Sequence, residues 1–193
     1  MSLPRNVFIP SMDARFGYVN DIPENKRPDL VVYNDHKKHY QLQSIVPTSS
    51  YKFQSSTLKH SLVVGISLHE AQLRHGPAQY SWKLDFGSGS PYNKSGQLRP
   101  EDLDHRHAAL LTAVAQSLKK FGEVNRDGGR ATHLYIQTNS ESLFRILGWG
   151  EKPKDVFKTG DYVHGLTAFY GEVQKAIKKA EAHGRHVKFW LIK

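Results

Sequence analysis

Three polar residues, Thr138, Asn139 and Ser140, stand where an expected buried strand gives way to an expected helix in the segment HLYIQTNSESLFRIL. The carboxyl ends of sheet strands are where α/β proteins commonly place ligands and catalytic groups. The central residue of this corner is a neutral amide, which is a weaker partner for Mg²⁺ than a carboxylate and does not take up or release a proton near neutral pH. The corner thus has the position of a catalytic site without an acid.

A second polar run, Asp104, His105, Arg106 and His107, precedes an expected helix, and Asp102 lies close by. Two histidines that are two positions apart on a helix point about 200° away from each other, so they are poorly placed to share a metal ion. We expect Asp104 to cap the helix and the other side chains to face solvent or phosphate.

Several carboxylates remain elsewhere in the chain. Glu70 follows His69 beyond an expected strand, and His75 is in the following loop. Asp85 ends another expected strand, and Glu141 begins a helix, where the helix dipole favours a negative charge. A hydrolytic centre rebuilt from these groups stays open as an alternative.

The composition is that of a globular protein with one substantial core or a domain with an extension. The chain has 193 residues, of which 38% are hydrophobic, and a mean hydropathy of −0.56. No run of about 18 apolar residues is present, which excludes a transmembrane helix, and the N-terminus lacks the apolar core of a signal peptide. The absence of cysteine excludes disulfides and thiolate metal sites. We expect an intracellular protein, nuclear or cytoplasmic, without a membrane partner.

The net charge of +9 is concentrated near the end of the chain. Residues 145–193 carry 10 basic and 5 acidic side chains, for a net charge of +5, whereas residues 61–144 carry 9 and 8, for a net charge of +1. A one-sided basic field suits a polyanion such as nucleic acid, because neutralising phosphates releases counterions. The alternative is a solvated helix face that only aids solubility.

The first 60 residues are rich in Pro, Ser, Asn and Lys and differ from the rest of the chain. Only residues 29–34 form a clear strand candidate, and PTSSYKFQSST, residues 47–57, is a loop by composition. We predict that residues 1–60 are an N-terminal extension packed on or flanking a domain formed by residues 61–193.

The pattern of residues 61–193 predicts alternating strands and helices. SLVVGISL is a continuous apolar strand, AQYSWKLDFGSG alternates like a half-buried strand, and SPYNKSGQL follows a glycine-rich turn as a third strand. A helix with an expected stop at Gly122 follows, then the strand THLYIQT, a short helix, a long helix ended by His183-Gly184, and the strand RHVKFWLIK. The order β-β-β-α-β-α-α-β predicts one mixed α/β sheet with helices packed on it.

These segments resemble the ribonuclease H family, in particular its fungal branch. AQYSWKLDFGSGSPYNKSGQL is similar to the second and third strands of that branch, and HRHAALLTAV to its helix opening, where Arg-Ala-Glu-Leu-Leu is usual. LYIQTNSESLFRIL resembles the fourth strand, where Thr-Asp-Ser is usual, and residues 161–193 resemble the penultimate helix and fifth strand. The resemblance implies a ribonuclease H-like fold with a central mixed five-stranded sheet.

The resemblance also implies a reaction, the hydrolysis of RNA in RNA–DNA hybrids by two Mg²⁺ ions about 4 Å apart, held by carboxylates. In the match, the family's first acid falls on Ile66 or Ser67, its glutamate on Ala109 and its next aspartate on Asn139. The last acid belongs to a helix beyond the fifth strand. A pocket without these charges should not hold two Mg²⁺ ions. We therefore expect no catalytic residues, no metal and no cofactor, with Mg²⁺ required only if the chain is active.

The leading hypothesis is a catalytically inactive module that binds RNA or an RNA–DNA hybrid, or scaffolds a nucleoprotein complex. A pure protein-interaction module is the first alternative, and an active ribonuclease H with an unusual metal site is the second. The candidate nucleic-acid-binding residues are Asn93, Lys94, Arg106, His107, Ser140, Trp149, Lys152 and Lys154, with Tyr162 as a second aromatic side chain able to stack.

Overall fold

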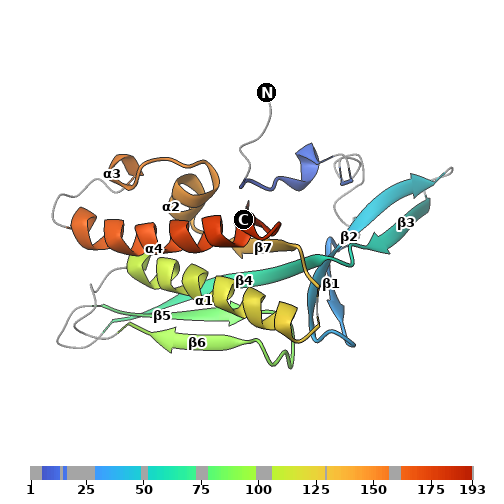
Figure 1. The fold of residues 1–193 in the computed structure, drawn as a ribbon, viewed down its shortest axis with the longest axis horizontal. Helices are drawn as coiled ribbons and strands as arrows, with labels where there is room; N and C mark the ends of the chain where they lie inside the picture. The colour runs from blue at the N-terminus through green and yellow to red at the C-terminus, as the bar shows by residue number, and fades with distance from the viewer. Residues whose placement is uncertain are drawn as a thin grey trace.

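A mixed β-sheet with helices on one face forms the centre of the computed structural model (Figure 1). The structure describes residues 6–13, 15–16, 29–48, 52–72, 78–98, 106–128, 130–156 and 162–192. The strands are β1 (Val31–Asn34), β2 (His39–Thr48), β3 (Lys52–Thr57), β4 (Ser61–Ala71), β5 (Gln79–Asp85), β6 (Lys94–Gln97), β7 (His133–Thr138) and β8 (His186–Leu191). The helical segments are η1 (Pro10–Met12), α1 (Arg106–Arg126), α2 (Glu141–Leu143), η4 (Phe144–Gly148), α3 (Pro153–Val156) and α4 (Tyr162–Ala182).

Five of these strands form a sheet in the order β6-β5-β4-β7-β8. β5 runs antiparallel to β4 and β6, while β7 runs parallel to β4 and β8. This is the strand order and direction of the ribonuclease H-like fold. The predicted mixed α/β sheet with helices packed on it is therefore confirmed, whereas the sheet has eight strands among the described residues and not the five expected.

Residues of the N-terminal extension continue this sheet and do not form a separate unit. β2 pairs with β4 at Tyr40 and Val63, next to the stretch of β4 that pairs with β5, and β1 pairs with β2. The residues around Val7 bridge to β8, since Phe8 N donates to Phe189 O at 2.9 Å and Phe189 N donates to Asn6 O at 2.7 Å. The boundary at residue 60 itself stays a prediction.

Two details of the sequence-based assignment are wrong. Within the segment 47–57, predicted as a loop, residues 47–48 end β2 and residues 52–57 form β3, and the two strands make a ribbon that projects from the sheet in Figure 1. Backbone pairing from Gln43–Thr57 to Thr48–Lys52 builds this ribbon from residues whose polar composition resembles a loop. Helix α1 also runs past Gly122, because burial of Phe121 and Val124 outweighs the cost of about 1 kcal/mol for a glycine inside a helix.

The sheet is covered on both faces. One core lies between the sheet and α1 and α4, and includes Leu62, Val64, Ile136, Leu111 and Val173. A second, smaller core lies on the opposite face, where Phe8, Phe16 and Leu42 from the extension pack against Val63 and Tyr135. Parallel strands in the middle of a sheet require cover on both faces, and here the N-terminal extension supplies the second cover.

We predict that Phe8→Ala destabilises the whole domain by about 3–5 kcal/mol. The Phe8 ring is buried and makes edge-to-face contacts with Phe16, Tyr135 and Trp190 at centroid distances of 5.5, 4.8 and 5.2 Å. Urea unfolding followed by circular dichroism measures the change. Met12→Ala is the control, because Met12 is 58% exposed. A Phe8→Ala protein as stable as the Met12→Ala protein would show that the extension is not part of the folding unit.

Candidate functional site

The corner at the end of β7 is built by two of its own polar side chains. The Thr138 hydroxyl accepts a hydrogen bond from Ser140 N at 3.1 Å, and the Ser140 hydroxyl accepts one from Leu143 N at 3.3 Å, which caps α2. Both side chains are buried, whereas Asn139 between them is exposed. The hydroxyl of Ser140, a residue predicted to contact nucleic acid, thus caps the N-terminus of α2.

The other positions matched to lost acids lie on different faces of β4. Ile66 pairs in register with Thr138 and belongs to the same core as Ala109, which is fully buried on α1. Ser67 points to the opposite face, where it lines a groove of about 460 Å³ with His69 and Lys83. Since successive side chains of a strand alternate between faces, Ile66 and not Ser67 shares a face with Ala109. Which of the two positions corresponds to the family's first acid stays a prediction.

This arrangement fills the expected metal position with hydrocarbon. Ile66 is 5% exposed and Ala109 is 0% exposed, so neither offers an oxygen ligand nor leaves its surroundings open to water. Mg²⁺ needs six oxygen ligands in near-octahedral geometry and keeps several waters. The residues at this position do not fit a pair of Mg²⁺ ions.

The surviving carboxylates do not gather at a second centre. Asp85 holds a turn, because its Oδ1 accepts a hydrogen bond from Gly87 N at 2.9 Å. Glu70 and Glu141 are exposed at the far end of β4 and the first turn of α2. Among the described residues, no three His, Asp or Glu side chains are placed to hold a metal ion. The candidate groups Asp102, Asp104, His105 and His75 lie outside the described residues.

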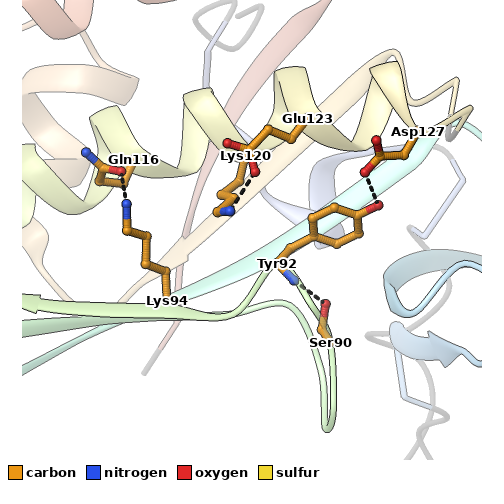
Figure 2. A network of polar contacts seen from close by, with 7 residues as sticks. All are labelled: Ser90, Tyr92, Lys94, Gln116, Lys120, Glu123 and Asp127. Carbon is orange, nitrogen blue, oxygen red and sulfur yellow. Dashed lines mark hydrogen bonds and ion pairs between the residues drawn. The ribbon is translucent and has the colours of Figure 1, made fainter.

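Asn93 and Lys94 hold the β5–β6 hairpin and its contact with α1. The Asn93 amide donates to Gly87 O at 2.8 Å and accepts from Phe86 N at 2.7 Å, which closes the turn. Figure 2 shows Lys94 reaching to α1, where its ammonium group donates to Gln116 at 2.7 Å. Asn93 and Lys94, predicted to contact nucleic acid, thus form hydrogen bonds within the protein. They could bind a ligand with the same groups only if these hydrogen bonds broke.

Four of the remaining predicted residues lie on or near the surface. Arg106 is exposed at the start of α1 and His107 is half-buried behind it. Trp149 is 47% exposed and Lys152 is exposed three residues later. Lys154 lies in α3, and the side chains of Lys154 and Tyr162 are outside the described part of the chain.

An ion pair fixes the turn that presents Trp149. The Arg145 guanidinium donates to both carboxylate oxygens of Glu151, from Nε at 2.9 Å and from Nη2 at 2.5 Å. This pairing lowers the pKa of the Glu151 carboxyl below its usual range. Trp149 lines a hollow of about 310 Å³, the Trp149 hollow, which Lys178, Tyr170, Gln174 and Glu181 of α4 also line.

On its other side, α4 forms a second concavity with α1. This α1–α4 groove has a volume of about 440 Å³ and an apolar floor that includes Leu118 and Ala180. Its polar rim consists of Lys119, Lys179, His183 and Arg185, and no acidic side chain lines it. Lys178 and Lys179 are neighbours on α4. Lys178 lines the Trp149 hollow, and Lys179 lines the α1–α4 groove.

Sequence reasoning located the charge of α4 but not these concavities. Lys178 and Lys179 were part of the basic excess near the end of the chain, yet Lys119 and Arg185 are more than 60 residues apart and no local spacing connects them. The partial signal was the pairing of an exposed tryptophan with a basic helix in the same stretch. Only the packing of α4 against α1, with Trp149 beside α4 in the Trp149 hollow, brings the set together.

Comparison with known proteins gives one structural similarity that we report. No protein-family model and no curated protein matches this sequence. Among solved structures, the chain is similar to the crystal structure of RNase H1 from the halophilic archaeon Halobacterium salinarum NRC-1, with 14% identity and a TM-score of 0.38. The similarity covers 68% of this chain and 85% of that one. The fold assignment rests on the strand order and directions described above.

We predict that a carboxylate at residue 109, the position on α1 matched to the family's glutamate, lowers the stability of the protein. Ala109→Glu should destabilise it by at least about 1–3 kcal/mol, because added side-chain volume strains a filled core and a charge would be desolvated there. Asn139→Asp should leave stability within about 0.5 kcal/mol, since Asn139 is exposed. Thermal unfolding of both variants tests this difference. An Ala109→Glu protein with wild-type stability would mean that solvent reaches this position.

Proposed function

We propose that this chain is a ribonuclease H-like module without a nuclease centre that binds a nucleic-acid strand across the surface of α4. The observation that carries the proposal is the arrangement around Lys178 and Lys179, where an exposed tryptophan lies on one side of the helix and a rim of cations on the other. The non-catalytic half is supported by the buried, apolar residues Ile66 and Ala109.

The chemistry of this surface suits a polyanion with flat bases. Lys119, Lys178 and Lys179 make no ion pair with another described residue, so their ammonium groups can contact phosphates without breaking an internal pair. The Arg185 guanidinium stacks over the Phe121 ring at 5.6 Å, which holds it at the rim of the α1–α4 groove. An exposed indole adds a stacking surface, and such stacking contributes about 1–3 kcal/mol per base in single-strand binding.

A pure protein-interaction module is the second candidate, and the β2–β3 ribbon favours it. The ribbon projects from the sheet (Figure 1), and β3 pairs with β2 alone among the described strands. Val46 on this ribbon is 53% exposed. An unpaired strand edge can accept a strand from another protein.

We predict that the protein binds single-stranded RNA, double-stranded RNA or an RNA–DNA hybrid with an affinity that falls steeply with salt. The double variant Lys178→Gln/Lys179→Gln should weaken binding. It should also reduce the slope of log affinity against log salt concentration by about 1–2, since each lost phosphate contact removes about 0.7–0.9 from this slope. Fluorescence anisotropy over a series of salt concentrations measures both quantities.

The matched control is Lys38→Gln/Lys83→Gln, which removes the same charge from exposed lysines in the β1–β2 turn and on the opposite face of the sheet. This control variant should keep most of the wild-type dependence of affinity on salt concentration. Equal losses in the two double variants would indicate a diffuse charge effect and contradict an interface on α4. If the protein binds none of the three nucleic acids at low salt, the proposed nucleic-acid-binding function is wrong. The protein-interaction module then becomes the leading candidate.

We also predict that the protein does not cleave an RNA–DNA hybrid in the presence of Mg²⁺ or Mn²⁺. The expected metal position offers no carboxylate, and Asp85, Glu70 and Glu141 do not converge on a substitute. Cleavage is measured on a labelled hybrid, with Glu70→Ala and Asp104→Ala as paired variants. Metal-dependent cleavage that either variant abolishes would establish the active ribonuclease with an unusual metal site instead.

A further inference from the structure

A cationic pocket lies at the opposite end of the parallel strands from Asn139. It has a volume of about 230 Å³ and is lined by Arg15, Lys59, His60, Thr132, His133 and Tyr135, and we call it the histidine pocket. Its walls come from the N-terminal extension, the turn before β4 and the start of β7. Backbone hydrogen bonds fix two of these walls to each other, since Thr132 N and His133 N both donate to His60 O, at 2.9 and 3.0 Å.

Positive groups surround His133 from every element that packs near it. The His186 ring on β8 lies 4.8 Å from the His133 ring, centroid to centroid, and Lys188 is next on the same face of β8. Arg15 and His60 approach from the extension and from the turn. The groups that bear on the pocket are Asp13, Arg15, Lys37, Lys59, His60, His133, Tyr135, His186 and Lys188.

The one carboxylate in this set is already paired. Asp13 accepts hydrogen bonds from Arg15 Nε at 2.9 Å and Nη2 at 2.7 Å, and it does not line the pocket. Burial and the surrounding cations lower the pKa of His133 to about 4. Asp13 thus compensates the charge of Arg15, whereas no described acidic side chain lines the pocket beside Lys59, His60 and His133.

Such a concavity favours an anion over a metal ion. Cationic neighbours repel Mg²⁺ or Zn²⁺, and the histidines do not form a metal-binding group with any third His, Asp or Glu of the described residues. Hydrogen-bond donors are available for oxygen atoms. The His60 ring is oriented by the hydrogen bond that its Nδ1 donates to Arg130 O at 3.0 Å, and Lys59 adds an ammonium group, while the Thr132 hydroxyl is bonded to His133 Nδ1 at 2.9 Å.

We propose that the histidine pocket binds a dianionic oxyanion of the phosphate type, held between Arg15, Lys59, His60 and His133. The source is either the terminal phosphate of a nucleic-acid strand or a free phosphate group. The pocket is separate from the α4 surface, so this proposal does not depend on the proposed function. A bound dianion stabilises the protonated rings, so binding takes up protons and should strengthen as pH falls.

The test is a titration of the full chain with sulfate, followed by NMR of the histidine ring protons, against chloride at matched ionic strength. Sulfate keeps its charge between about pH 5 and pH 8, where the charge of histidine changes. We expect saturable shifts of the His60 and His133 signals, with at least about threefold tighter binding at the lower pH. The exposed His36 in the β1–β2 turn should not respond.

Two variants decide whether the shifts report this pocket. Lys59→Gln should weaken binding several-fold, whereas Lys83→Gln, an exposed lysine on a distant groove, should not. Arg15→Gln is a second pocket variant, and its unfolding midpoint shows whether it still folds. Shifts no larger than with chloride, or shifts that are the same in Lys59→Gln and Lys83→Gln, would overturn the proposal.

The source of the phosphate is resolved with the Lys178→Gln/Lys179→Gln protein, in which the proposed nucleic-acid surface is disabled. Inorganic phosphate and a pair of oligonucleotides, with and without a 5′-phosphate, are added in separate titrations. A response of His133 to the phosphorylated oligonucleotide that exceeds the response to inorganic phosphate assigns the pocket to strand ends. An equal response assigns it to free phosphate. A response to neither contradicts the proposal while leaving the α4 surface to its own test.

Discussion

The parallel pairing of β4 with β7 and of β7 with β8 sets the main constraint on this structure. Strands in the middle of such a sheet have side chains on both faces, and both faces must be removed from water. The helices α1 and α4 cover one face, as the ribonuclease H-like arrangement provides. On the other face, Phe8, Phe16 and Leu42 of the extension pack against Val63 and Tyr135. A segment whose composition suggested an appendage is thus structurally required.

The same close packing accounts for the polar and apolar side chains at the expected catalytic corner. Ile66 and Ala109 belong to the helix-side core, and Thr138 and Ser140 use their hydroxyls to end β7 and to begin α2. Asn93 and Lys94 are likewise bonded within the hairpin and to α1. The hydrogen bonds of these polar side chains to the backbone and to α1 account for their presence, which alone is therefore no evidence of ligand binding.

Free positive charge is located elsewhere, at two places that differ in character. On α4 the cations are exposed and flank an exposed tryptophan, an arrangement that suits a long, flexible polyanion. In the histidine pocket the exposed Lys59 and His60 and the half-buried His133 converge on a small volume, which suits one compact anion. Like charges held close together cost free energy unless a ligand compensates them, and this cost is larger where water is partly excluded. The two surfaces therefore call for different ligands.

The sequence by itself determined the order of the elements from Ser61 onward, because apolar runs and alternation follow directly from which side chains a strand or helix buries. It also determined the loss of carboxylates at Ala109 and Asn139, which is a matter of residue identity. The tertiary structure decided the rest. It paired residues 43–48 with residues 52–57 in a ribbon, placed Ile66 rather than Ser67 in the core that contains Ala109, and brought Arg15 to His60 and His133. Those outcomes depend on contacts between residues far apart in the chain, and local composition and spacing contain no information about such contacts.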